Sequence, residues 1–369
     1  MPIVAIVIWI VLPIGWLPIL KNNLQMMNKR YLKIGFIGAG RVADVHYNAL
    51  QECGEVAQLA AFCDLRPEAV YSRQKEWGVP GFASIATMLD SVQLDAVVAL
   101  VPHNIHLDVM KKCLERKLPV LLEKPIAAKM EEALEITRLS DEAGVPVLVG
   151  HNGLFHPSLD RIVKFVSEGW IGKPLMASAK SLQWLDFRPW DFRKSLEQTG
   201  GGAWMDCAGH LIYRLNAILG EVQDVTGFVS HQARDEMEGE DTAIAVLRFA
   251  SGVIGHAVVS YGCKLPGYEK DWPSGCEQML MVSGDKGMVE YHICPDPHIR
   301  YYTELEGCEI AKPGVWEEVA VDEPFETSFT EQMRHFLECV NGKQKCKVTP
   351  MDATRLLKTL LKLYENQEN

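Results

Sequence analysis

Two groups of side chains, distant from each other in the sequence, have the types and spacing that acid–base chemistry needs. Lys124 stands near the end of the run Leu-Pro-Val-Leu-Leu-Glu-Lys-Pro, directly after an apolar strand pattern. Asp206 and His210 are four residues apart, which places both on one face of a helix. The imidazole can accept a proton near neutral pH, and an adjacent carboxylate would orient it and stabilise its protonated form. We therefore predict that Lys124, Asp206 and His210 are catalytic.

Each of these signals has a simpler alternative. Lysines are mostly exposed, so Lys124 taken alone fits a surface residue after a short strand. An Asp–His pair at this spacing is also common on protein surfaces. The residues around the pair, Trp204, Met205, Leu211 and Ile212, are apolar and favour burial. Burying an ammonium group without a partner costs free energy. The surroundings of Lys124 therefore decide whether it is a surface residue or a functional one.

A glycine-rich segment near the start of the chain has the spacing of a dinucleotide-binding loop. Gly38-x-Gly40-x-x-Ala43 follows an apolar run and precedes a helical pattern. In this fingerprint the first glycine turns tightly, the second lets the pyrophosphate approach the backbone, and a small third residue lets helix and strand pack closely. The amides of Arg41 and Val42, where the helix begins, would face the phosphates. A glycine turn with a purely structural role is the alternative.

Asp64 is the candidate for binding the ribose of such a cofactor. It follows the next apolar run, about two dozen residues after Gly40, near the roughly 20-residue spacing expected for the ribose-binding acid. A carboxylate here accepts hydrogen bonds from the ribose hydroxyls and repels a 2′-phosphate, so we predict NAD as the cofactor and NADP as less favoured. Arg66 would weaken this preference. A helix cap ahead of Pro67 is the alternative role for Asp64.

The elements that must position these residues alternate over the first 150 residues. Strand and helix patterns follow one another at residues 95–101, 103–117, 120–122, 130–143 and 145–150. This order predicts an α/β fold with a doubly wound parallel sheet, the Rossmann arrangement, in which ligands bind at the carboxyl ends of the strands. Pro102, His106, Glu123 and Lys124 follow such strand ends, and we predict that they contact the cofactor.

After residue 150 the pattern changes to longer strands, with one helix at 158–168. Candidate strands cover residues 175–184, 222–230, 241–249, 253–261, 278–283 and 287–291. They predict a C-terminal α+β domain with a large, mostly antiparallel sheet. Two final helices, at 325–340 and 351–364, are expected to pack back on the first domain.

This reading divides the chain into three parts: an apolar extension at 1–30, a Rossmann domain that binds NAD(P) at 31–150, and a substrate and oligomerisation domain at 151–369. The strands of the last part, such as Ala-Ile-Ala-Val-Leu from Ala243, are broadly apolar and indicate cover on both faces of their sheet. We therefore predict a homo-oligomer, a dimer or tetramer, that forms through the open face.

Composition excludes several classes of partner. The 369 residues carry a net charge of −11, which opposes binding to nucleic acid or to an anionic membrane surface. The ten cysteines form neither a C-x-x-C pair nor a Cys/His cluster at zinc spacing, so we assign no metal. They are typical of free thiols in a reducing compartment. We therefore expect the protein in the cytoplasm.

Residues 1–20 are apolar and, as a helix rising about 1.5 Å per residue, are just long enough to span a bilayer core. Pro13 and Pro18 interrupt such a helix, and a basic n-region and a cleavage site are missing, so we do not expect export. Two interpretations stay open. One is a membrane anchor that leaves the rest of the chain in the cytoplasm. The other is a start-site artefact, with the natural protein beginning at Met26 or Met27.

Taken together, these motifs resemble the Gfo/Idh/MocA family of glucose–fructose oxidoreductase and inositol dehydrogenase. The resemblance covers residues 31–369 and rests on Gly38-x-Gly40-x-x-Ala43, Pro102 with His106, Glu123-Lys124-Pro125, Gly169-x-x-Gly172, Gly200-Gly-Gly with Asp206 and His210, and Glu240-Asp-Thr-Ala243. It implies a two-domain NAD(P)-dependent enzyme in which Lys124 reaches between nicotinamide and substrate. It also implies that His210, oriented by Asp206, removes the hydroxyl proton as hydride leaves for the cofactor.

One position departs from the pattern of the family. Family members commonly have a basic residue before the aromatic that follows the sixth strand, whereas this chain has Leu154 before Phe155. Asn152 or His156 are the candidates to replace the contact that the basic residue makes with cofactor or substrate. We include Asn152 and His210 among the predicted substrate-binding residues.

Residues 184–199 form a long loop in which aromatic and charged side chains alternate. Aromatic faces with interleaved Arg and Asp suit a polyhydroxylated ring, so Trp190 and Arg193 are further candidates for substrate binding, although a loop packed over the sheet fits nearly as well. The resemblance implies a sugar, a sugar derivative or a cyclitol as substrate. Two other functions stay open: a redox-neutral NAD-dependent glycosidase of the same family, and a non-catalytic NAD-binding regulator.

Overall fold

The computed structural model describes residues 31–188, 191–267, 275–365 and 367. Its first half contains a six-stranded parallel sheet with strand order β3-β2-β1-β4-β5-β6. The strands are β1 (Leu32–Ile37), β2 (Ala57–Cys63), β3 (Gly81–Phe82), β4 (Ala96–Ala99), β5 (Val120–Glu123) and β6 (Val147–Gly150). This confirms the predicted Rossmann sheet.

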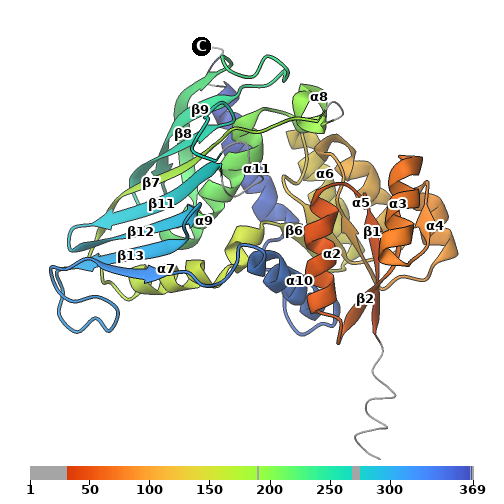
Figure 1. Cartoon of the computed structure of the whole chain (residues 1–369), viewed down its shortest axis with the longest axis horizontal. Helices are drawn as coiled ribbons and strands as arrows, with labels where there is room; N and C mark the ends of the chain where they lie inside the picture. The colour runs from red at the N-terminus through yellow and green to blue at the C-terminus, as the bar shows by residue number, and fades with distance from the viewer. Residues whose placement is uncertain (1–30, 189–190, 268–274, 366, 368–369) are drawn as a thin grey trace, which may run out of the picture.

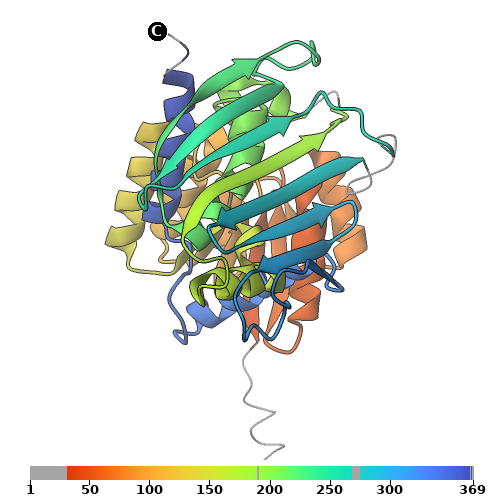
Figure 2. The same cartoon turned by 90° about the vertical axis from the view of Figure 1, so that its left-hand side faces the viewer.

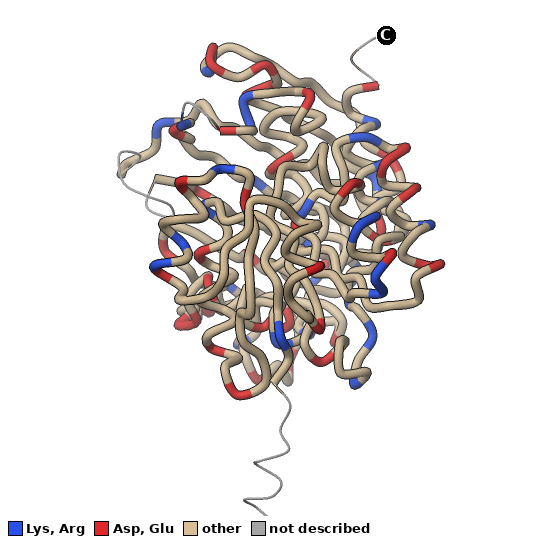
Figure 3. The backbone as a smooth tube through the Cα atoms, turned by 90° about the vertical axis from the view of Figure 1, so that its right-hand side faces the viewer, with Lys and Arg blue, Asp and Glu red and all other residues tan. Residues whose placement is uncertain are grey.

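Helices cover both faces of the six-stranded sheet (Figure 1), which is why β4, β5 and β6 are buried along their whole length. These helices are α2 (Val42–Glu52), α3 (Pro67–Trp77), α4 (Ile85–Ser91), α5 (His106–Leu114) and α6 (Met130–Ala143), with a 3₁₀ turn η2 (His103–Ile105) before α5. The strand order reverses between β1 and β4, so the crevice for a ligand lies at their carboxyl ends. Figure 3 shows Lys and Arg interspersed with Asp and Glu on this side of the molecule.

The second half contains an eight-stranded sheet with order β14-β13-β12-β11-β7-β10-β9-β8, antiparallel except where β7 meets β10. Its strands are β7 (Pro174–Gln183), β8 (Val222–Ser230), β9 (Thr242–Phe249), β10 (Ile254–Ser260), β11 (Cys276–Gly284), β12 (Gly287–Cys294), β13 (His298–Thr303) and β14 (Glu317–Ala320). The predicted α+β class is therefore confirmed, and two of its strands, β13 and β14, were not predicted.

The eight-stranded sheet is covered on one face only. Along β9, Ala243, Ala245 and Leu247 are buried while Ile244 and Val246 between them are exposed. The buried face packs toward the six-stranded sheet, and the other face is open toward the viewer in Figure 2. The elements that accompany this sheet are η3 (Asn152–Phe155), α7 (Pro157–Ser167), η4 (Phe192–Lys194), α8 (Leu196–Thr199), the π-helix η5 (Trp204–Ala208) and α9 (Gly209–Leu219).

The last two helices, α10 (Thr327–Val340) and α11 (Pro350–Glu365), return to the helices of the six-stranded sheet. Phe329 of α10 packs edge-to-face on His46 of α2, with ring centroids 5.3 Å apart. The hydroxyls of Thr354 on α11 and Thr137 on α6 are 2.9 Å apart and buried. The two sheets are thus joined by packing as well as by the chain.

Two strand ends of the second sheet carry a disulfide between Cys276 and Cys294. The prediction of free thiols is therefore wrong for this pair and holds for the other eight cysteines. The antiparallel pairing of β11 with β12 brings the two Cα atoms to 6.4 Å, a separation that depends on strand register and cannot be read from the sequence. Within the described residues no helix is long and apolar enough to cross a bilayer, and the interpretations of residues 1–30 lie outside them.

Candidate active site

The predicted glycine-rich loop connects β1 with α2. Gly38 has φ = 97°, and a Cβ there would lie 2.2 Å from the carbonyl oxygen of Leu100, so no other residue fits this turn. At Gly40, by contrast, no heavy atom lies within 4 Å of where a Cβ would be. A Cβ at Gly40 would therefore point into open space, two residues before α2 begins at Val42, where a phosphate would bind. The loop fits a dinucleotide.

Asp64 holds this loop from the end of the neighbouring strand β2. Its carboxylate accepts hydrogen bonds from the amide of Ala39 (2.9 Å) and from both the amide and the guanidinium of Arg66, whose Nη2 lies at 2.9 Å. Burial alone would raise the pKa of Asp64, but the bonds from Arg66 and Ala39 outweigh it and lower the pKa. The carboxylate is therefore charged, and its four acceptor positions are already used.

Three residues predicted to contact the cofactor, Glu123, His106 and Pro102, have structural roles at the carboxyl edge of the sheet. Glu123 accepts a hydrogen bond from the amide of Lys124 (3.1 Å) and lies 2.7 Å from Nε2 of His46. His106 is fully buried, with its ring nitrogens 3.0 and 3.1 Å from the carbonyl oxygens of Val101 and Ile126. Pro102 precedes the 3₁₀ turn η2 that leads into α5. Because a neutral imidazole donates from only one nitrogen, a cofactor contact with the N–H of His106 would break its one hydrogen bond to these carbonyl oxygens.

Lys124 crosses from the six-stranded sheet to the second half of the chain. Its Nζ lies 2.5 Å from Oδ1 of Asp206 and 3.0 Å from the carbonyl oxygen of the same residue. The side chains are 16% and 15% exposed, so the pair is mostly screened from water. Burial alone would lower the pKa of Lys124, but the negative charge of Asp206 raises it. Lys124 is therefore neither exposed nor unpaired.

Asp206 lies in the π-helix η5, and its second carboxylate oxygen accepts a hydrogen bond from the hydroxyl of Tyr261. Burial alone would raise the pKa of Asp206, but the charges of Lys124 and Arg193 hold it well below its ordinary value. The thiol of Cys207 donates in turn to the Tyr261 hydroxyl (3.3 Å). Lysine, carboxylate and phenol thus form one buried network.

The sequence led us to expect that Asp206 orients His210, and among the described residues no hydrogen bond joins the two side chains. An ammonium charge and a phenol hydroxyl are stronger partners for a buried carboxylate than a neutral imidazole, and they occupy both oxygens. Tyr261, which follows β10, was missed because it carries no motif. Only the arrangement of β10 beside β7 brings it to the network.

His210 is partly exposed, as Lys124 and Asp206 are. Among the described residues neither of its ring nitrogens has a hydrogen-bond partner, whereas Asp206 and Lys124 are paired with each other. Its ring lies near that of His151, which follows β6, with centroids 6.4 Å apart. Burial, followed by the positive charges of Lys124 and Arg214, lowers the pKa of His210 well below its ordinary value. The imidazole is therefore neutral at neutral pH and free to accept a proton.

The predicted substrate-binding residues fall into different environments. The amide of Asn152 donates to the hydroxyl of Ser328 (2.8 Å) and is 2% exposed. His156, its alternative, accepts from the amide of Ser158 as the cap of α7. Arg193 pairs with Asp191 (2.6 Å), and its pKa, which burial alone would lower, is raised by Asp191 and then by the charge of Asp206. Trp190 lies outside the described residues.

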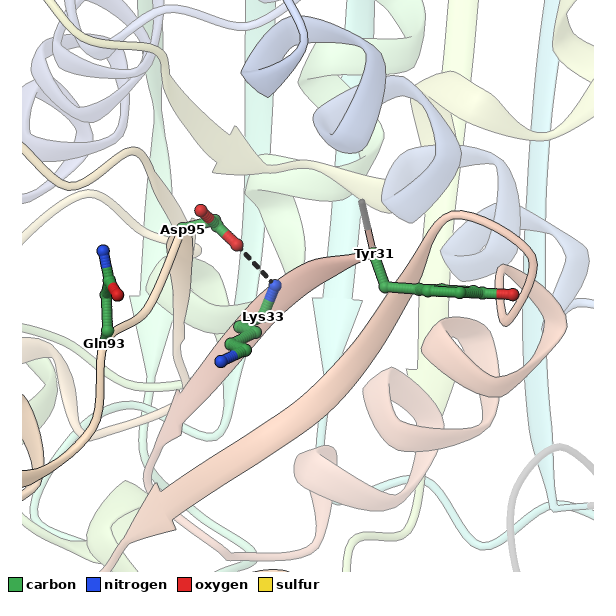
Figure 4. Close-up of a pocket in the computed structure, with 4 residues that line it drawn as sticks. All are labelled: Tyr31, Lys33, Gln93 and Asp95. Atoms are coloured by element: carbon green, nitrogen blue, oxygen red, sulfur yellow. Dashed lines mark hydrogen bonds between the residues drawn. The ribbon is translucent and has the colours of Figure 1, made fainter. Parts of the chain in front are cut away.

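A cavity of about 310 Å³ lies at the opposite edge of the six-stranded sheet (Figure 4). Tyr31, Lys33, Gln93 and Asp95 line it, and the amide of Lys33 donates to the Asp95 carboxylate (2.8 Å). These residues stand at the amino ends of β1 and β4, whereas the network of Lys124 lies at the carboxyl edge. This cavity is therefore separate from the candidate active site.

Comparison with curated proteins gives relatives of several activities. The chain is 26% identical over 273 residues to a 2,7-anhydro-N-acetylneuraminate hydratase of Escherichia coli K12, covering 72% of this chain and 67% of the relative. It is 24% identical over 332 residues to scyllo-inositol 2-dehydrogenase (NAD(+)) of Bacillus subtilis 168, covering 88% and 90%. The solved structure of a levoglucosan dehydrogenase with NADH and levoglucosan superposes with a TM-score of 0.81 at 15% identity, covering 92% and 98%. At that identity the likeness concerns the fold alone.

Two family matches cover most of the described chain. Residues 32–151 match the oxidoreductase family with an NAD-binding Rossmann fold, and residues 159–290 match the GFO/IDH/MocA C-terminal domain. The first match contains the glycine-rich loop, Asp64 and Lys124, and the second contains Asp206 and His210. Together with the two sheets and the network that joins them, these matches show that the chain belongs to the Gfo/Idh/MocA oxidoreductase family.

Proposed function

We propose that this protein is an NAD-dependent oxidoreductase that moves a hydride between nicotinamide and a secondary alcohol of a sugar, a sugar derivative or a cyclitol. The observation that carries the proposal is the buried Lys124–Asp206 pair at the carboxyl edge of the cofactor-binding sheet, beside the unpaired His210. We infer that a base, a cation and a cofactor loop serve one site. The inositol dehydrogenase among the relatives supports the substrate class.

The residues divide the chemistry as follows. The glycine-rich loop would hold NAD, which would supply the hydride acceptor. A neutral ring nitrogen of His210 accepts the proton of the substrate hydroxyl. The ammonium of Lys124 donates a hydrogen bond to the same oxygen as negative charge develops on it. Asp206 keeps this lysine charged and fixes its direction, and Tyr261 holds the carboxylate in place.

A spectrophotometric screen tests the proposal directly. Sugars, cyclitols and nucleotide sugars are offered with NAD and with NADP separately, and NADH or NADPH formation is followed at several pH values. We expect NADH to accumulate with at least one polyhydroxylated compound. Absence of net oxidation and of the reverse reduction across the panel would contradict the proposal.

A redox-neutral reaction is the second candidate, because the E. coli relative is a hydratase, an enzyme named for a reaction without net oxidation. Such an enzyme would convert its substrate while NAD stays bound and no NADH accumulates. Product analysis of the same screen by mass spectrometry separates the two candidates. Conversion without NADH would favour the redox-neutral function.

The cofactor preference gives a prediction about Arg66. Its guanidinium occupies acceptor positions of Asp64 that the ribose hydroxyls would use, and it is the cation beside the expected position of a 2′-phosphate. Arg66→Ala should therefore increase the preference for NAD over NADP by about tenfold, since a charge-assisted hydrogen bond contributes about 1.5–3 kcal/mol. The Kd values of both cofactors, from protein fluorescence, give the ratio. Asp64→Ala should shift the ratio toward NADP.

Arg73→Ala is the matched control for Arg66→Ala, because Arg73 lies on the helix that follows Arg66 but pairs with Asp44 and Glu76 instead of Asp64. We expect it to leave the ratio unchanged. An unchanged ratio in Arg66→Ala as well would show that this guanidinium is remote from the ribose.

We also propose that the protein forms a homo-oligomer through the open face of the eight-stranded sheet. Five apolar side chains are 43–81% exposed there and lie on neighbouring strands: Phe228, Ile244, Val246, Ile254 and Met176. Such a contiguous apolar patch is typical of an interface. Light scattering of the wild type should give a dimer or tetramer, and Ile244→Glu with Val246→Glu should shift it toward monomer.

Leu134→Glu serves as the control for the sheet variant, because Leu134 is 53% exposed on α6, away from the patch. We expect it to keep the wild-type mass. A monomeric wild type at micromolar concentration would refute the proposed interface.

For the compartment we propose the cytoplasm. The eight free cysteines support a reducing environment, whereas the Cys276–Cys294 disulfide is the observation against it. Cell fractionation with an antibody against the protein tests this assignment, and recovery in an exported fraction would overturn it.

A further inference from the structure

Arg214 is a buried cation for which the described part of the chain supplies no partner. It lies on α9 and is 3% exposed. Its Nη1 atom is fully enclosed without a hydrogen-bond partner, and among the described residues Arg214 forms no ion pair and no hydrogen bond. A guanidinium keeps its charge in proteins, so it cannot avoid the cost of burial by losing a proton. An uncompensated buried charge costs several kcal/mol.

The backbone leaves room for this guanidinium at one point. A Cβ at Gly153 would lie 2.5 Å from Nη2 of Arg214 and 2.7 Å from its Cζ, so any side chain at this position would displace it. Gly153 belongs to η3, which follows β6 at the carboxyl edge of the cofactor-binding sheet. Arg214 therefore reaches from the second half of the chain to the edge where ligands bind.

Arg214 also lies next to the proposed base. It is four residues after His210 on α9, which puts both side chains on the same face of the helix. After burial and the charge of Lys124, the positive charge of Arg214 also lowers the pKa of His210 and that of His151. Arg214 thus stands one helical turn from the proposed base.

The acidic side chains nearby do not pair with Arg214 within the described residues. Asp206 accepts from Lys124 and Tyr261, and Glu323 pairs with Arg161 through Oε1, while its buried Oε2 has no hydrogen-bond partner there. A ligand carboxylate would supply the negative charge that Arg214 lacks. Because Lys124 is neutralised by Asp206, a single unpaired cation remains in this group, which matches a monoanion. The planar fork of a guanidinium fits the two oxygens of a carboxylate.

We propose that Arg214 binds a carboxylate of the substrate, so that the preferred substrate is a polyhydroxy acid rather than a neutral sugar or cyclitol. This inference deepens the proposed function and rests on it for the identity of the reacting alcohol. The carboxylate would be held beyond His210, and the hydroxyl to be oxidised would lie between His210 and Lys124.

The experiment compares each acid with its neutral counterpart: D-gluconate with D-sorbitol, D-glucuronate with D-glucose, and D-galacturonate with D-galactose. Calorimetry with the NAD-saturated full-length protein gives the Kd of each compound without any need for turnover. For at least one pair we expect the acid to bind at least about tenfold more tightly, as a desolvated bidentate ion pair predicts.

Two variants identify the residue responsible. Arg214→Met removes the charge at similar length, and should reduce the acid-to-neutral preference to about one. Arg214→Lys keeps the charge without the fork, and should retain part of the preference. Thermal unfolding without ligand checks the fold. Arg214→Met should be at least as stable as the wild type, because it removes an unpaired buried charge.

The outcomes separate this inference from the proposed function. Equal affinity for acids and neutral compounds in the wild type, or a preference that survives in Arg214→Met, would overturn the carboxylate site even if neutral sugars are oxidised. If acids bind in a way that depends on Arg214 but no compound is oxidised, the carboxylate site is supported. The proposed dehydrogenase activity is then refuted.

Discussion

Replacing Lys124 with methionine should reduce kcat/KM for alcohol oxidation by about 10³-fold, at the upper end of the loss that follows removal of one donor to a developing oxyanion. The ammonium is mostly buried, so its charge acts on the substrate oxygen with little screening by water. We expect a higher KM as well as a lower kcat, because the same hydrogen bond holds the ground state. Steady-state kinetics on the substrate from the screen measure both constants.

The single variant leaves Asp206 as a buried carboxylate without its cation, which should destabilise the fold by about 3–5 kcal/mol. The double variant Lys124→Met with Asp206→Leu removes both charges and should recover most of that stability. Its activity should stay as low as that of Lys124→Met. Denaturant unfolding of both variants therefore separates loss of folding from loss of chemistry. Wild-type kinetics in a folded Lys124 variant would refute its role.

The parts of this molecule that sequence reasoning predicted are those fixed by local rules. Gly38 needs a positive φ, and the glycine spacing before a helix expresses that need directly. The apolar run before Lys124 marks a buried parallel strand, and its end fixes the edge at which the lysine stands. The two sheets were predicted for the same reason, since strand periodicity and connection length are local properties.

The parts that could not be predicted depend on which strands lie side by side. Tyr261 reaches Asp206 because β10 follows β7 in the sheet order, and Cys276 meets Cys294 because of the β11–β12 register. The four-residue spacing of Asp206 and His210 did not indicate that Lys124 is the stronger partner of the carboxylate. No motif in the sequence indicates that Arg214 is buried.

Replacing His210 with alanine should lower kcat by about 10²–10⁴-fold, the contribution that a positioned general base typically makes. Binding of NAD should be unchanged, because the glycine-rich loop and Asp64 belong to the other half of the chain. His210→Gln keeps a hydrogen-bonding side chain of similar size and should be as slow as His210→Ala, since neither can accept the proton. Wild-type turnover in either variant would remove His210 from the mechanism.

The pH dependence of kcat/KM should reflect the charged groups around His210. Burial and the charges of Lys124, Arg214 and His151 lower its pKa, and only the nearby Asp206 opposes them. Because the neutral imidazole is the active form, kcat/KM should stay constant as the pH falls through the ordinary histidine value of 6.5 and decline only well below it. Arg214→Met removes one positive charge, which raises the pKa of His210, so the acid limb should move to higher pH. A limb at 6.5 in the wild type, unmoved by Arg214→Met, would show that His210 is not the base.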